Sequence, residues 1–124
     1  MKIYICEHCG NIVEMVKDSG VNPVCCGQKM TRLVPGTVEA SHEKHIPVIR
    51  REGDRVDVFV GAVEHPMSAE HSIEWVSLVT AGGTRRVYLQ PGDAPTVSFA
   101  AVEKGPVTVY AYCNLHGLWR ADAE

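Results

Sequence analysis

Residues 107–113 read VTVYAYC, and this run decides how the larger part of the chain is expected to fold. Alternate residues of a β-strand point to the same face of a sheet. One face of this segment is therefore expected to carry only small or apolar side chains, those of Val107, Val109, Ala111 and Cys113. Such alternation is typical of a strand that packs one face against a core.

Further segments before this run are short and rich in Val, Ile, Tyr and Phe. They cover residues 46–50, 55–61, 74–80, 85–90 and 96–101, and glycine-containing turn signals lie between them at 52–54, 81–83, 91–93 and 104–106. In segment 55–61 the alternate valines Val56, Val58 and Val60 share one face. Six or seven short strands without a convincing amphipathic helix predict a mainly β protein with an immunoglobulin-like β-sandwich.

The Pro35-Gly36 pair is a turn signal that marks a domain boundary. We therefore expect one domain over residues 1–36 and a second over residues 37–124. The first is shorter than the roughly 40 residues that usually fold without help, and it has few large apolar side chains. A unit of this kind needs a staple, which a bound metal would supply.

Four cysteines near the N-terminus form the first candidate site, in CEHCG (6–10) and CCG (25–27). They are Cys6, Cys9, Cys25 and Cys26. Sets of four thiolates hold zinc or iron, and ligand type alone leaves both metals open. The glycine after each cysteine motif relaxes the backbone there. Disulfides are the competing interpretation.

Composition and charge exclude several classes of function. The net charge of −3 gives no broad basic surface for nucleic acid. The chain has no run of about 18 apolar residues, so no membrane-spanning helix is expected. The N-terminal MKIYICEHCG lacks the apolar core of a secretory signal peptide. We therefore expect the protein to lie in the cytoplasm, where disulfides are rare. The odd total of five cysteines also favours thiolate ligands over a closed disulfide framework.

The second candidate site is spread over HEKHIP (42–47), EHPMSAEHSIEW (64–75) and CNLHGLW (113–119). Its candidate ligands are His45, His65, His71, Cys113 and His116. Taken singly, each histidine has an ordinary loop or turn role, and the cysteine suits a core. If they converge, four imidazoles and one thiolate suit iron or copper better than structural zinc. Five ligands would leave one position open to a small molecule, and Lys44 would add positive charge beside it.

The order of these motifs closely resembles that of desulfoferrodoxin, the two-iron superoxide reductase family. CEHCG and CCG resemble its desulforedoxin-like N-terminal motif. The motifs EKHIPVI, VEHPM, HSIEW, PGDAP and YCNLHGLW resemble those of its catalytic domain, in the same order. The resemblance covers essentially the whole chain.

The resemblance implies a rubredoxin-type Fe(Cys)4 centre at the four N-terminal cysteines. It also implies a second iron with His45, His65, His71 and His116 in a plane and Cys113 as the axial ligand. Superoxide would take one electron at the open position and leave as hydrogen peroxide. Glu43 matches the carboxylate that closes this position after oxidation, and Lys44 matches the lysine that attracts superoxide. Rubredoxin or a similar protein would restore ferrous iron, and the family forms homodimers.

Two other interpretations share these residues. An electron-transfer protein would use the same ligands without superoxide reductase activity. A zinc-stapled binding module on the same sandwich would contain zinc and be colourless.

Overall fold

The computed structural model describes every residue from Met1 to Glu124. The chain forms two compact units, Met1–Val34 and Pro35–Glu124, so the division falls on the N-terminal side of the Pro35-Gly36 pair. Nearly all regular structure is β, and the single helix has four residues. No helix is long and apolar enough to cross a membrane.

The first unit consists of two small antiparallel sheets. Strand β1 (Ile3–Ile5) lies between β2 (Ile12–Glu14) and β5 (Thr31–Arg32), and β3 (Val24–Cys25) pairs with β4 (Gln28–Lys29). Its fully buried apolar side chains are those of Ile3, Cys6 and Met30. This core is too small to stabilise a separate unit by apolar burial alone, which agrees with the expected need for a staple.

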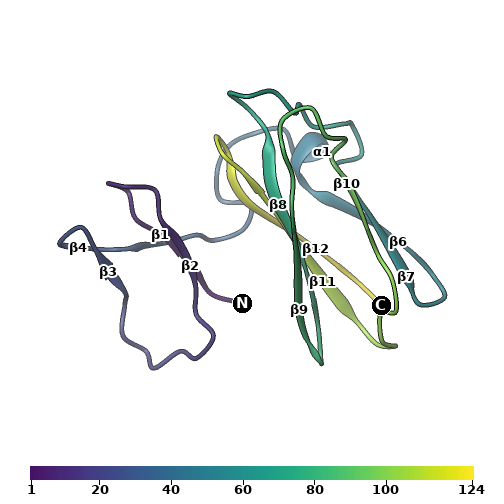
Figure 1. Cartoon of the computed structure of the whole chain (residues 1–124), viewed down its shortest axis with the longest axis horizontal. Helices are drawn as coiled ribbons and strands as arrows, with labels where there is room; N and C mark the ends of the chain where they lie inside the picture. The colour runs from purple at the N-terminus through teal and green to yellow at the C-terminus, as the bar shows by residue number, and fades with distance from the viewer. The chain divides into compact units, whose positions relative to one another are not determined.

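The second unit is a sandwich of two antiparallel sheets (Figure 1). One sheet has the order β10 (Thr96–Phe99), β7 (Arg55–Val60), β6 (Pro47–Glu52). The other has the order β12 (Gly117–Ala123), β11 (Val107–Cys113), β8 (Ile73–Thr80), β9 (Gly83–Tyr88). The expected immunoglobulin-like architecture is confirmed, and the short helix α1 (His42–His45) leads into β6.

Strand β12 is the strand of the second unit that the sequence pattern did not predict. Its residues alternate between the buried or half-buried side chains of Trp119 and Ala121 and the exposed side chains of Arg120 and Asp122. The segment pairs with β11 along its whole length. It forms a strand because β11 offers a full edge of backbone donors and acceptors, although its charged residues weaken the strand signal.

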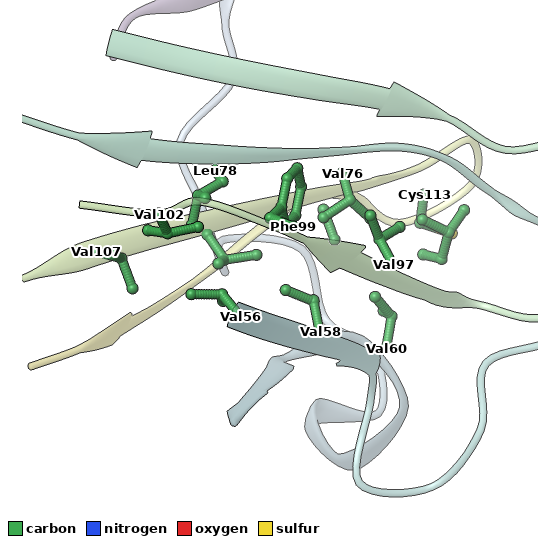
Figure 2. Packing of buried hydrophobic residues seen from close by; sticks show 13 residues of the cluster. Val56, Val58, Val60, Val76, Leu78, Val97, Phe99, Val102, Val107 and Cys113 are labelled. Carbon is green, nitrogen blue, oxygen red and sulfur yellow. The ribbon is translucent and has the colours of Figure 1, made fainter. Parts of the chain in front are cut away.

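The valines of β7 form a row inside the sandwich, and the predicted core faces of β7 and β11 are confirmed. In β11 the opposite face is buried as well, through Tyr110 and Tyr112. Figure 2 shows Val56, Val58 and Val60 in line, with Val107 near one end of the row and Cys113 near the other. All of these side chains are at most 1% exposed. Cys113 is thus the last core residue of β11, and the next loop begins directly after it.

Strand pairing gathers three loops at one end of the sandwich. Cys113, the end of β11, pairs with Ile73 at the start of β8 and with Gly117 at the start of β12. In the other sheet Pro47 pairs with Val60, so α1 and the loop after β7 leave that sheet together. Residues 42–46, 61–72 and 114–116 therefore meet at this end, where loops of a sandwich can combine into a site.

Val76 and Val87 lie opposite each other in the β8–β9 pair but differ in burial, with exposed fractions of 0% and 36%. We expect Val76→Ala to lower the free energy of unfolding by about 2 kcal/mol, because it removes two buried methyl groups and leaves a cavity. Val87→Ala, the same substitution at the sheet edge, should cost less than half as much. Chemical denaturation monitored by circular dichroism measures both, and equal losses would contradict this account of the core.

Candidate metal centres

The four N-terminal cysteines converge on one point in the first unit. Their sulfur atoms all lie within 4.8 Å of one another, and none of the five cysteines of the chain is in a disulfide. The Sγ atoms of Cys9 and Cys25 are 3.6 Å apart, and those of Cys25 and Cys26 are 4.0 Å apart. The geometry therefore favours a shared metal over the disulfide interpretation.

The protonation of these thiols is strongly interdependent. The backbone N–H of Cys9 donates to the Sγ of Cys6 at 3.5 Å, and this bond is the main reason that the pKa of Cys6 falls to about 6. The neighbouring thiol of Cys9 is the main cause that raises the pKa of Cys26 to about 12. The raised pKa of Cys26 opposes joint ionisation of the four thiols, and the positive charge of a metal at the centre of the cluster would favour it.

The second cluster lies at the loop end of the sandwich and unites all three predicted stretches. His45 ends α1, His65 and His71 lie in the loop between β7 and β8, and Cys113 ends β11. Their donor atoms are within 4.8 Å of one another. His116 joins them, because its Nδ1 lies 3.2 Å from the Nε2 of His45 and 3.9 Å from the Sγ of Cys113. The fold brings together all five candidate ligands.

The hydrogen bonds of His45 and His65 show why this cluster fits a metal. The Nδ1 atoms donate to the carbonyl oxygens of Ser41 at 2.7 Å and Pro66 at 2.6 Å. A carbonyl only accepts, so Nδ1 carries the hydrogen and Nε2 of a neutral imidazole is left with a lone pair. The two Nε2 atoms nevertheless face each other at 3.1 Å. A bound cation would turn this repulsion between lone pairs into shared coordination.

Burial keeps the imidazoles in the form that binds metals. The side chains of His45 and His65 are only 2% exposed, and burial lowers the pKa of both, to about 4 for His65. Burial is also the main cause that lowers the pKa of His71, whose buried Nε2 has no hydrogen-bond partner. The pKa of the Cys113 thiol is raised by burial, so a metal would have to displace its proton.

Trp119 supports two of the candidate ligands, a role that the sequence did not suggest. Its ring stacks on His45 at a centroid distance of 4.9 Å, and its Nε1–H donates to the carbonyl oxygen of His116 at 3.0 Å. A tryptophan on a core strand ordinarily serves packing. Trp119 is buried, as expected of packing, but much of what it packs against is the ligand cluster.

The carbonyl groups of Ser41 and Pro66 were equally invisible in the sequence, since any residue type supplies a carbonyl. Only the position of Pro66 directly after His65 hinted at a constrained backbone beside a ligand.

Glu43 and Lys44 are exposed on α1 beside His45 and do not belong to the ligand cluster. The positive charge of Lys44 contributes, after burial, to the lowered pKa of His45 and His71, so the ammonium group lies within electrostatic reach of the cluster. The helix is held close to the end of β7, because the carbonyl of Glu43 accepts from Val63 at 2.9 Å. The close approach of the helix also requires glycine at position 61, because a Cβ atom there would come within 2.7 Å of the same carbonyl oxygen.

The fold and these two clusters define a two-site metalloprotein, with four thiols in a small β unit and four imidazoles plus one thiol in a β-sandwich. A family model described as "Desulfoferrodoxin, N-terminal domain" matches residues 1–33. A second, described as "Desulfoferrodoxin", matches residues 37–122. The chain belongs to the desulfoferrodoxin family.

Individual relatives agree with this assignment. The desulfoferrodoxin of Syntrophotalea carbinolica is 45% identical over 98% of this chain and 96% of its own length. The solved superoxide reductase of Treponema pallidum is 35% identical, with a TM-score of 0.77 over 96% of this chain and 98% of that one. A one-iron superoxide reductase of Giardia intestinalis, 32% identical with a TM-score of 0.58, matches 66% of this chain but 98% of its own.

The buried histidines predict a pH dependence for the metal-free protein. Because folding lowers the pKa of His65 from 6.5 to about 4, the unfolded state binds more protons between these values. Stability is therefore fully present above pH 6.5 and falls as the pH decreases. From pH 7 to pH 5, His65 alone should lower the free energy of unfolding by about 2 kcal/mol.

Urea unfolding of chelator-treated protein at these two pH values measures the effect. His65→Gln, which cannot titrate in this range, should reduce the pH dependence. A wild-type stability that does not change between pH 7 and pH 5 would contradict the buried neutral state of these imidazoles.

Proposed function

We propose that this protein is a superoxide reductase with two mononuclear iron sites. Cys6, Cys9, Cys25 and Cys26 would hold an Fe(Cys)4 centre in the first unit. His45, His65, His71, Cys113 and His116 would hold the catalytic Fe(His)4(Cys) centre in the second.

One observation carries this proposal: four imidazoles and one thiol converge at a single point, and the exposed Lys44 directly precedes one of these ligands, His45, in the chain. Nitrogen donors with one soft sulfur suit iron, whereas structural zinc sites take four ligands. Five ligands leave one of the six positions of iron open. The relatives named superoxide reductase support this function for the same fold.

The reaction needs one electron and two protons for each superoxide that becomes hydrogen peroxide. Ferrous iron held by the second cluster would supply the electron, and the thiolate of Cys113 would increase its electron-donating power. The ammonium group of Lys44 would attract the anionic substrate and help to deliver a proton. The carboxylate of Glu43, its neighbour on α1, would occupy the open position when no substrate is bound to the oxidised centre.

The donor of the electron and the assembly of the protein complete the proposal. Rubredoxin or a similar small redox protein would return the second iron to the ferrous state. We also propose that the protein acts in the cytoplasm as a homodimer. Its net charge of −3 means that attraction of superoxide is a local effect around Lys44 rather than a property of the whole surface.

The direct test is the product of superoxide consumption by the iron-loaded, reduced protein. A superoxide reductase gives hydrogen peroxide without dioxygen, whereas dismutation gives both products. A protein that only transfers electrons would not consume superoxide at a high rate. Metal analysis and visible spectra before and after oxidation test the iron content at the same time. A colourless protein that contains zinc would refute the proposal.

Cys113→Ser should separate the two centres. Loss of a partner outside the ligand set typically costs 10- to 100-fold in metal-site activity, so loss of this sulfur should slow superoxide reduction by about 100-fold or more. The visible bands of the N-terminal centre should persist, because its four cysteines are unchanged. Stopped-flow or pulse-radiolysis kinetics measure the rate, and wild-type kinetics in this variant would refute the role of Cys113.

Lys44→Ala should slow the encounter with superoxide by about five- to tenfold at low ionic strength and weaken its salt dependence, because a local charge is lost. Lys104→Ala is the matched control. It removes the same charge from the loop before β11, at the end of that strand opposite Cys113. Equal second-order rate constants for both variants at low salt would count against steering by Lys44.

A further inference from the structure

Asn114 connects the end of β11 to the loop that carries His71. Its backbone N–H donates to the carbonyl of Ser72 at 3.2 Å. Its side chain makes two more bonds: Oδ1 accepts from the N–H of Ser72 at 3.0 Å, and Nδ2 donates to the carbonyl of Glu70 at 2.8 Å. One donor and one acceptor of the loop thus fix the orientation of the amide. The amide binds the residues on both sides of His71.

These hydrogen bonds of Asn114 lie next to an irregularity in the pairing of β8 with β11. The β8–β11 ladder pairs Tyr112 with Trp75 but Cys113 with Ile73, so Glu74 is an extra residue and the register shifts. A bulge of this kind disrupts backbone pairing and redirects the strand. The side-chain amide of Asn114 carries the same donor and acceptor groups as a peptide. The Asn114 side chain therefore extends the pairing between the two segments past the bulge, to Ser72 and Glu70, which precede β8.

His71 depends on this support more than its neighbours do. The rings of His45 and His65 are each fixed by an Nδ1 bond to a carbonyl, but the ring of His71 has no such bond, and its buried Nε2 has no partner. Its backbone is held from within the loop by Ser68, whose hydroxyl accepts from the His71 N–H at 3.1 Å. The hydrogen bonds of Asn114 connect this turn to the strand end that carries Cys113.

We propose that Asn114 is a positioning residue that fixes His71 relative to Cys113 in the second metal centre. The amide sets the distance between the two loops before metal binds, so that the backbone around His71 need not lose conformational freedom on binding. This inference rests on the proposed metal centre but concerns the order of the metal-free site.

Cobalt(II) is a suitable probe, since its thiolate and ligand-field bands report binding without any turnover. The full-length chain with Cys6, Cys9, Cys25 and Cys26 replaced by serine confines the spectral change to the second centre. In this background, Asn114→Ala should weaken Co²⁺ binding by about tenfold or more, the range expected for groups that orient metal ligands. Amide hydrogen exchange at Ser72 should accelerate in the metal-free protein, because the N–H loses its acceptor.

Asn114→Asp, nearly identical in size, guards against a failure of the alanine variant to fold. It keeps an acceptor for the Ser72 N–H but loses the donor to Glu70, and its charged oxygen faces that carbonyl. We expect it to weaken Co²⁺ binding while leaving Ser72 partly protected. Thr108→Val is the matched control, because it removes a side-chain bond to Asp122 from the same strand, far from the site. It should leave Co²⁺ affinity unchanged.

A double-mutant cycle with His71→Ala decides whether Asn114 acts through His71. In the His71→Ala background, Asn114→Ala should change Co²⁺ affinity by no more than about twofold, the usual error of additivity. An equal, roughly tenfold loss in both backgrounds would overturn the proposal, as would wild-type affinity in both Asn114 variants. If His71→Ala itself leaves the Co²⁺ affinity and spectrum unchanged, His71 is not a metal ligand. That outcome would refute the proposed ligand set, and with it the role of Asn114.

Discussion

The facing lone pairs of His45 and His65 are the constraint on which the second metal site depends. Their Nε2 atoms lie 3.1 Å apart while both Nδ1 atoms donate to backbone carbonyls, so neither ring can turn its N–H toward the other without breaking a short bond. This arrangement is unfavourable in a metal-free core and favourable around a cation. The unfavourable contact persists because the rest of the sandwich holds both rings in place. Local strain of this kind is common at functional sites.

The rigidity of the sandwich explains how loops can hold such a site. Cys113 is the last residue of the buried row and the first at the site, so packing of the core places its sulfur directly (Figure 2). The other ligands reach it from loops, and backbone groups or polar side chains anchor each of them. Trp119 covers His45 and binds the backbone of His116, while Asn114 brackets His71. Support from outside the ligand set is what orients metal ligands.

The two units use metal ligands for different physical purposes. The first unit has almost no apolar core, and its four thiols resist joint ionisation, so a metal there would contribute directly to folding. The second unit has a complete core, and burial lowers the pKa of His45, His65 and His71, which favours their neutral form. Here the folded structure would prepare the site before the metal binds.

The sequence by itself determined the class of fold and the ligand types. Period-two alternation in residues 55–61 and 107–113 specified core strands, and the grouping of Cys6 and Cys9 with Cys25 and Cys26 specified a thiolate cluster. It missed β12, whose exposed charges hide a strand that exists because β11 offers it an edge.

Tertiary structure alone decided which nitrogen of His45 and of His65 faces the centre, and which groups hold the ligands there. These features depend on the carbonyls of Ser41 and Pro66, which any residue type could supply, and on contacts between distant positions such as Asn114 and Glu70. Local patterns report the propensity of a segment and the burial of its faces. The orientation of a side chain at the meeting point of three loops is set only when all three have packed.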